Sequence, residues 1–191
     1  MLLTLTAGFG AAALAAGGAY FAPHLVRLTQ ARRLRAVCAR QRALVLTYDD
    51  GPGPELTRRV LALLGEFGAR ATFFLLGRRV VEHPEVVDEV AAAGHELGCH
   101  GYSHRHAWRC WPWEPAADVQ RGYDTIRRWA AADAPYRPPS GKLVLPMWWV
   151  LRRQGAPLGG GPSIPATRTR PCPTRGRSLR PSATPVAAWC C

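Results

Sequence analysis

Two adjacent carboxylates, Asp49 and Asp50, are the first residues in the chain whose placement suggests chemistry. They follow a β-rich run at residues 44–48 and precede Gly51-Pro52, so they lie where a strand turns into a loop. Because side chains alternate along a strand, one carboxylate could bind a metal ion while its neighbour stays free as a base. On its own, the pair could equally be a solvated Asp-Gly turn.

Two histidines, His100 and His104, supply the ligand type that the carboxylates lack. Their spacing lets both imidazoles reach one ion from a tight loop or a single helical turn, and His106 is a third candidate close by. Two histidines and one carboxylate form a frequent catalytic metal set that leaves positions open for water and substrate. Such a metal lowers the pKa of bound water and polarises a carbonyl oxygen. These residues therefore predict metal-assisted hydrolysis of an acyl bond, with zinc favoured by the ligand types.

The elements that must position these residues alternate between strand and helix. This alternation predicts an α/β domain with a parallel sheet, either doubly wound or barrel-like. In both architectures functional residues collect where strands end, which is where Asp49, Asp50, His100, His104 and Arg137 fall. The predicted strands cover residues 44–48, 72–76 and 95–99, with a fourth opening at 136; the predicted helices cover 55–67, 79–93 with a break at Pro84, 118–132 and 143–153.

Three short motifs resemble those of polysaccharide deacetylases, the carbohydrate esterase family four whose members include chitooligosaccharide deacetylase-like domains. Thr47-Tyr48-Asp49-Asp50-Gly51-Pro52 resembles the family's first motif, TFDDGP. His100-Gly101-Tyr102-Ser103-His104 is similar to the second, H-[ST]-x-x-H, and Tyr136 to Gly141 resembles the third, R-x-P-[YF]. The motifs occur in family order, and the resemblance covers residues 43–158.

The resemblance implies a role for each motif residue. It implies Asp49 as the general base, Arg137 as the residue that positions this base, and Asp50, His100 and His104 as ligands of a divalent metal ion. It also implies a distorted (β/α) barrel, and hydrolysis of N-acetyl groups on an N-acetylated amino-sugar polymer or oligomer.

The chain departs from the family pattern in several places. Gly101 replaces a Ser or Thr whose hydroxyl would brace the metal-binding loop, and Ser140 stands where an aromatic residue is usual. No match is found after Leu158 for the fourth motif, with its Trp and Asp, or for the fifth, a Leu-x-His that supplies the general acid. We therefore expect an incomplete barrel and a weakened or inactive enzyme. The alternative is a catalytically dead module that binds metal or glycan.

The segments that flank this domain differ from it in composition. Residues 1–26 begin with an uncharged Leu/Ala/Gly/Phe-rich stretch from Met1 to Pro23, which predicts a transmembrane helix acting as a membrane anchor, with a cleaved signal peptide as the rival. Residues 27–42 form a basic linker with six arginines. These arginines favour a cytoplasmic domain by the positive-inside rule, whereas the expected substrate favours an extracytoplasmic one. We expect the extracytoplasmic location.

Charge is unevenly distributed along the chain. The formal net charge is +12, but residues 43–158 hold 14 Lys and Arg against all 13 Asp and Glu, a net charge of +1. A nearly neutral domain argues against nucleic acid as a partner. The basic flanks leave open a third interpretation, a protein that acts at a membrane surface.

Residues 159–191 differ from the rest of the chain. They contain six prolines, five arginines, no acidic residue and no periodicity, which predicts a disordered tail. The genetic code also permits these residues to be a shifted reading of a sequence that contains Trp and Asp in a pattern similar to the missing fourth motif. A frameshifted tail is therefore a second interpretation.

Overall fold

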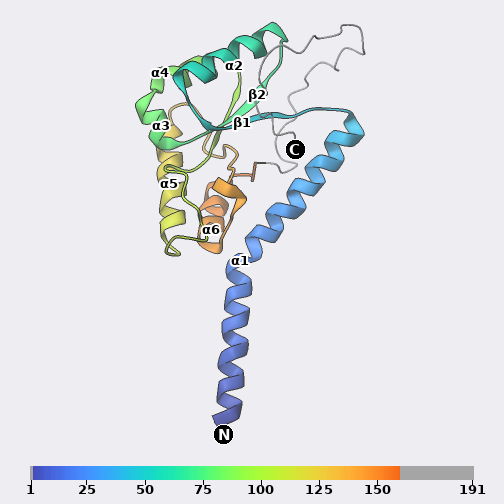
Figure 1. Ribbon diagram of the computed structural model, residues 1–191, viewed down its shortest axis with the longest axis vertical. Helices are drawn as coiled ribbons and strands as arrows, with labels where there is room; N and C mark the ends of the chain where they lie inside the picture. The colour runs from blue at the N-terminus through green and yellow to red at the C-terminus, as the bar shows by residue number, and fades with distance from the viewer. Residues whose placement is uncertain (1, 160–191) are drawn as a thin grey trace.

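The computed structural model describes the backbone of residues 2–159 and the side chains of residues 14–159, so most of the predicted tail lies outside the described residues. Helices and strands alternate along the chain as expected (Figure 1). The elements are α1 (Leu2–Gln41), β1 (Leu46–Gly51), α2 (Pro54–Glu66), β2 (Ala71–Leu75), α3 (Gly77–Glu82), α4 (Pro84–Ala92), β3 (Glu96–Cys99), α5 (Glu114–Ile126), the short 3-10 helix η1 (Pro139–Gly141) and α6 (Leu145–Gln154).

The strands form a parallel sheet in the order β1-β2-β3. Parallel single-residue bridges from Cys99 to Tyr136 and from Tyr136 to Leu158 continue the sheet in the same direction. The strands and the bridged residues therefore lie side by side in the order in which they occur in the sequence, with helices between them. This is the arrangement of a (β/α) barrel rather than of a doubly wound sheet. Within residues 2–159 the sheet stays open.

Most element boundaries agree with the sequence prediction to within two residues. The predicted break at Pro84 separates α3 from α4, because proline cannot donate the backbone hydrogen bond that would continue α3. Two details differ. Helix α5 begins and ends earlier than predicted, with Pro115 in its first turn, and Tyr136 makes only a bridge. Pro138 and Pro139, close behind Tyr136, lack the amide donors that a longer strand needs.

The core lies between the sheet and the helices that follow its strands. All five residues of β2 are buried, as expected for a strand with neighbours on both sides and covered faces. Val87 and Val90 of α4, and Tyr123 and Ile126 of α5, pack in the same cluster as Phe73 and Leu75. The hydroxyl of Tyr123 donates to the carbonyl oxygen of Ala134 at 2.8 Å, which satisfies the polar end of this buried ring.

Helix α1 holds both the predicted membrane anchor and the basic linker. Its middle lies beside α6, whereas its N-terminal part extends away from the domain (Figure 1). No helix in the described part of the chain is both long enough and apolar enough to cross a membrane. The transmembrane helix predicted within residues 1–26 is therefore not supported. Ala and Gly, whose small side chains bury little apolar area, make up 12 of the 26 residues of that segment.

Candidate metal centre

The two adjacent carboxylates diverge because β1 contains an extra residue. Tyr48 pairs with Phe73 and Gly51 pairs with Leu75, so two residues of β1 lie opposite one residue of β2. Within this bulge Asp50 has a φ of +63°, a left-handed conformation that Asp adopts more readily than most residues. The sequence predicted the divergence from simple strand alternation. The observed cause is the bulge, which directs Asp50 towards the histidines and leaves Asp49 facing Arg137.

His100 follows β3 directly and is 3% exposed. Its Nδ1 lies 2.7 Å from the carbonyl oxygen of Arg137. A carbonyl can only accept, so Nδ1 carries the proton and Nε2 of the neutral ring is left with a free lone pair. Burial lowers the pKa of His100, opposed by the carboxylates of Asp49 and Asp50 and by this hydrogen bond. Both the tautomer and the charge state suit a metal ligand.

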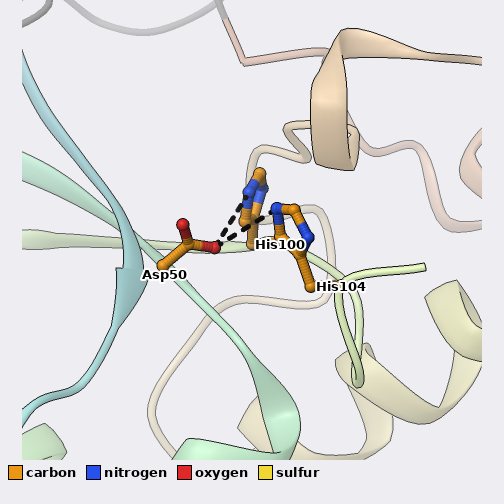
Figure 2. A group of neighbouring side chains, drawn as sticks. All are labelled: Asp50, His100 and His104. Atoms are coloured by element: carbon orange, nitrogen blue, oxygen red, sulfur yellow. Dashed lines mark ion pairs between the residues drawn. The ribbon is translucent and has the colours of Figure 1, made fainter. Parts of the chain in front are cut away.

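His104 completes a three-residue cluster with Asp50 and His100 (Figure 2). Its Nε2 lies 3.5 Å from Asp50 Oδ1, and Nε2 of His100 lies 3.6 Å from the same oxygen. One ligand atom from each of the three residues lies within 4.8 Å of the others. The structure thus brings together all three residues that the sequence proposed as metal ligands.

The donor set fits a divalent cation. In a tetrahedral zinc site with bonds near 2 Å, neighbouring donor atoms are about 3.3 Å apart, close to the two distances measured from Asp50. An unprotonated His100 Nε2 cannot hydrogen-bond to a carboxylate, but a cation between the two atoms would satisfy both. The side chains of Asp50 and His104 are 54% and 36% exposed, so water and substrate can approach from that side.

Asp49 and Arg137 form a second polar pair beside the cluster. Nη1 of Arg137 donates to Asp49 Oδ1 at 2.8 Å and to the hydroxyl of Thr47 at 2.9 Å. The guanidinium carbon also lies 4.2 Å from the ring centre of Phe74. This cation–π contact helps to fix the position of the charged group. Asp49 Oδ2 makes no hydrogen bond with any described residue, and this oxygen is free to accept a proton.

The family model for polysaccharide deacetylases matches residues 36–158, which is more than half of the chain. This chain belongs to the polysaccharide deacetylase family. The match agrees with the motif resemblance and ends at Leu158, where that resemblance also ends.

Individual relatives of this polysaccharide deacetylase domain are similar over shorter stretches. A peptidoglycan-N-acetylglucosamine deacetylase of Bacillus cereus is 36% identical over 103 residues, covering 54% of this chain and 48% of that protein. A chitooligosaccharide deacetylase of Rhizobium leguminosarum is 44% identical over 69 residues, covering 36% of this chain and 32% of that protein. The solved peptidoglycan N-acetylglucosamine deacetylase Bc1960 matches with a TM-score of 0.55 and 30% identity, covering 60% of this chain and 54% of that one. The chain therefore spans about half the length of such relatives, or less.

The structure separates the third histidine of the deacetylase motif region from the cluster. Nδ1 of His106 accepts a hydrogen bond from the backbone N–H of Trp108, and His106 is not in the three-residue group. Ser140, which replaces the usual aromatic residue, is exposed and has a φ of +51°.

One residue at this site was missed by the sequence analysis. The carboxylate of Asp118, on α5, accepts hydrogen bonds from the backbone N–H groups of Tyr102 and Ser103, between the two histidines. The available signal was an acidic residue spaced three and four positions from Pro115 and Gly122, two buried residues of the same helix. Helical periodicity gave no reason to connect that residue with a loop 15 or 16 positions earlier.

Cys99 lies next to His100 in the sequence but takes no part in the cluster. Its thiol is fully buried and accepts a hydrogen bond from the N–H of Gly101 at 3.4 Å. Burial raises the pKa of this thiol to about 12, so it remains protonated and is a poor metal ligand.

Proposed function

We propose that this chain is a metal-dependent hydrolase that removes N-acetyl groups from amino-sugar polymers or oligomers. The observation that carries the proposal is the position of the Asp49–Arg137 pair beside the Asp50–His100–His104 cluster, at one end of the sheet. The first pair supplies a held base, and the cluster supplies three ligands for a divalent cation. Zinc is the cation we propose, because two imidazoles and one carboxylate are ligands typical of catalytic zinc.

The roles of the residues follow from their contacts. A bound divalent cation would supply Lewis-acid polarisation of the acetyl carbonyl and a lowered pKa for water. Asp49 Oδ2 accepts the proton of the attacking water, while Arg137 holds the other carboxylate oxygen and so fixes the direction of the free one. His100 is kept in its Nδ1-protonated tautomer by the Arg137 carbonyl, with Nε2 facing the site.

We also propose that turnover is slow. The leaving amine needs a proton when the tetrahedral intermediate collapses, and the sequence offers no match to the Leu-x-His motif that would supply one. Loss of a positioned general acid costs on the order of 10² to 10⁴ in rate. The same missing motif favours a second candidate function, a glycan-binding module without catalysis.

The substrate class rests on the names of the relatives. One is a peptidoglycan-N-acetylglucosamine deacetylase and another a chitooligosaccharide deacetylase, so N-acetylated glucosamine is common to both names. We propose such a sugar as the substrate, and an extracytoplasmic location where such polymers are exposed. Protease accessibility of the domain in intact cells tests the location, and a protected domain would contradict it.

The proposed function is tested by acetate release. The full chain, loaded with zinc, is incubated with chitooligosaccharides or with peptidoglycan fragments, in parallel with H104A and with the exposed-surface control E55Q. We expect slow release by the parent chain and by E55Q, and none by H104A. Sugar binding without acetate release from the parent chain would instead support the binding module. Neither binding nor release would refute both.

A further inference from the structure

We propose that Asp118 is a positioning residue that fixes the His100–His104 loop for metal binding, in place of the side-chain brace that Gly101 cannot provide. The inference rests on the proposed metal site. It concerns a residue outside the three motifs, on a helix that contributes no ligand to that site.

Asp118 holds the loop through three hydrogen bonds. Its Oδ2 accepts from the N–H of Tyr102 at 2.9 Å, and its Oδ1 accepts from the N–H of Ser103 at 3.0 Å and from the Ser103 hydroxyl at 2.5 Å. The two amides are consecutive and lie between the two histidines. One carboxylate therefore fixes the backbone immediately before His104, which has an uncommon φ of +59°.

The other side of this loop is held by the start of α3. The carbonyl oxygens of Gly101 and Tyr102 accept from the N–H groups of Gly77 and Arg78, both at 3.0 Å. The amides on one side and the carbonyls on the other are thus all paired. If Asp118 were removed, two partly buried N–H groups would lose their acceptors, and the backbone at Tyr102 would be held from the α3 side only.

Gly101 and Asp118 are sterically matched. Gly101 has a φ of +83°, and a Cβ added there would lie 2.6 Å from Asp118 Oδ2. A Ser or Thr at position 101 and the carboxylate of residue 118 could not both occupy their present places. The glycine that removes the expected hydroxyl also makes room for the carboxylate that replaces its function.

Gly122 explains how α5 comes close enough to act. It lies one helical turn after Asp118, on the same face of α5. A Cβ at this position would lie 2.7 Å from the carbonyl carbon of Gly101. Because Gly122 lacks that atom, α5 packs against the loop backbone, and the short Asp118 side chain can reach the amides of Tyr102 and Ser103.

The test compares D118A and D118N with D124A in the full chain. Asp124 lies on the same helix but is 46% exposed, and its side chain pairs with Gln120 and Arg127 rather than with the loop. Zinc affinity is measured by competition with a chelator, and site geometry by the absorption spectrum of the Co²⁺-loaded chain. Replacing a residue that orients metal ligands typically costs about 10- to 100-fold in affinity. We expect that loss in D118A with a changed Co²⁺ spectrum, a smaller loss in D118N, and parent behaviour in D124A.

Amide hydrogen exchange in the parent chain and in D118N tests the proposal even if D118A does not fold. In the metal-free parent chain the N–H groups of Tyr102 and Ser103 should be protected, and in D118N they should exchange at least about tenfold faster, because a carboxamide has only one acceptor oxygen. If the variants bind zinc within twofold of the parent, or if exchange is unchanged, Asp118 does not position the loop. A parent chain that binds no metal but shows the exchange difference would refute the proposed function and confine Asp118 to holding the loop.

Discussion

The backbone carbonyl of Arg137 accepts a hydrogen bond from Nδ1 of His100 at 2.7 Å, while the side chain of the same Arg137 donates to Asp49 at 2.8 Å. One residue therefore orients a proposed metal ligand through its backbone and the proposed base through its side chain. Pro138 follows it and favours an extended conformation at residue 137, which helps to fix the direction of that carbonyl. The two functions can be separated by mutation, because a substitution changes the side chain but not the carbonyl.

Substitution R137K should reduce catalysis without reducing metal affinity. Lysine keeps the positive charge and the backbone contact to His100 but loses the planar group that reaches both Asp49 and Thr47. We expect acetate release to fall by at least about tenfold, as when a catalytic group is misplaced, with zinc affinity within about threefold of the parent. A matching loss of zinc affinity would show that the side chain acts on the ligands instead.

The neighbouring carboxylates should have different effects when each is changed alone. D49N removes the proposed base, so it should lower acetate release by about 10² to 10⁴ and leave zinc binding intact. D50N weakens a proposed ligand, so it should lower zinc affinity as well. Parallel zinc titrations and acetate assays on the two variants check this. Equal zinc affinities in D49N and D50N would contradict the assignment of Asp50 as the ligand.

Gly101 should not tolerate a side chain while Asp118 is present. G101A forces a left-handed φ on a residue with a Cβ and brings that atom against the carboxylate, so we expect a loss of about 1–3 kcal/mol in the free energy of unfolding. In G101A/D118A the steric conflict disappears, and the two losses should be less than additive. Urea unfolding of the parent, both single variants and the double variant measures this coupling. Strict additivity would mean that the two positions do not conflict.

Acid should destabilise the metal-free chain partly through His100. Burial lowers the pKa of His100 in the folded state, so below the ordinary histidine pKa of about 6.5 the unfolded chain binds a proton that the folded chain resists. The contribution to stability is complete above that pH and is lost as the pH falls. Thermal unfolding between pH 7.5 and pH 5, compared with H100Q, should show a shallower decline in the variant. Parallel curves would exclude His100 as a source of the decline.

The sequence predicted the parts of the site that depend on strand ends. Carboxyl ends of parallel strands share one edge of a sheet, so Asp50 near the end of β1 and His100 directly after β3 had to lie near each other once the strands were recognised. The direction of each carboxylate could not be predicted, because it depends on a one-residue bulge in β1. The role of Asp118 was also beyond reach, since it depends on how closely α5 approaches the loop at Gly122. The membrane anchor was inferred from charge-free composition alone, and in the described residues no helix meets the apolar requirement.

The burial of Cys99 gives the protein an internal chemical reporter. Burial raises the pKa of this thiol to about 12, so the thiol is protonated at neutral pH, and the sulfur is shielded from reagents as well. Cys38 and Cys110 are partly exposed, so among the cysteines of residues 14–159 an alkylating reagent should modify these two first. Modification of Cys99 then requires the packing of α5 against the Cys99–Gly101 backbone to open. The rate at which Cys99 is labelled would therefore report how often α5 separates from the sheet next to the His100–His104 loop.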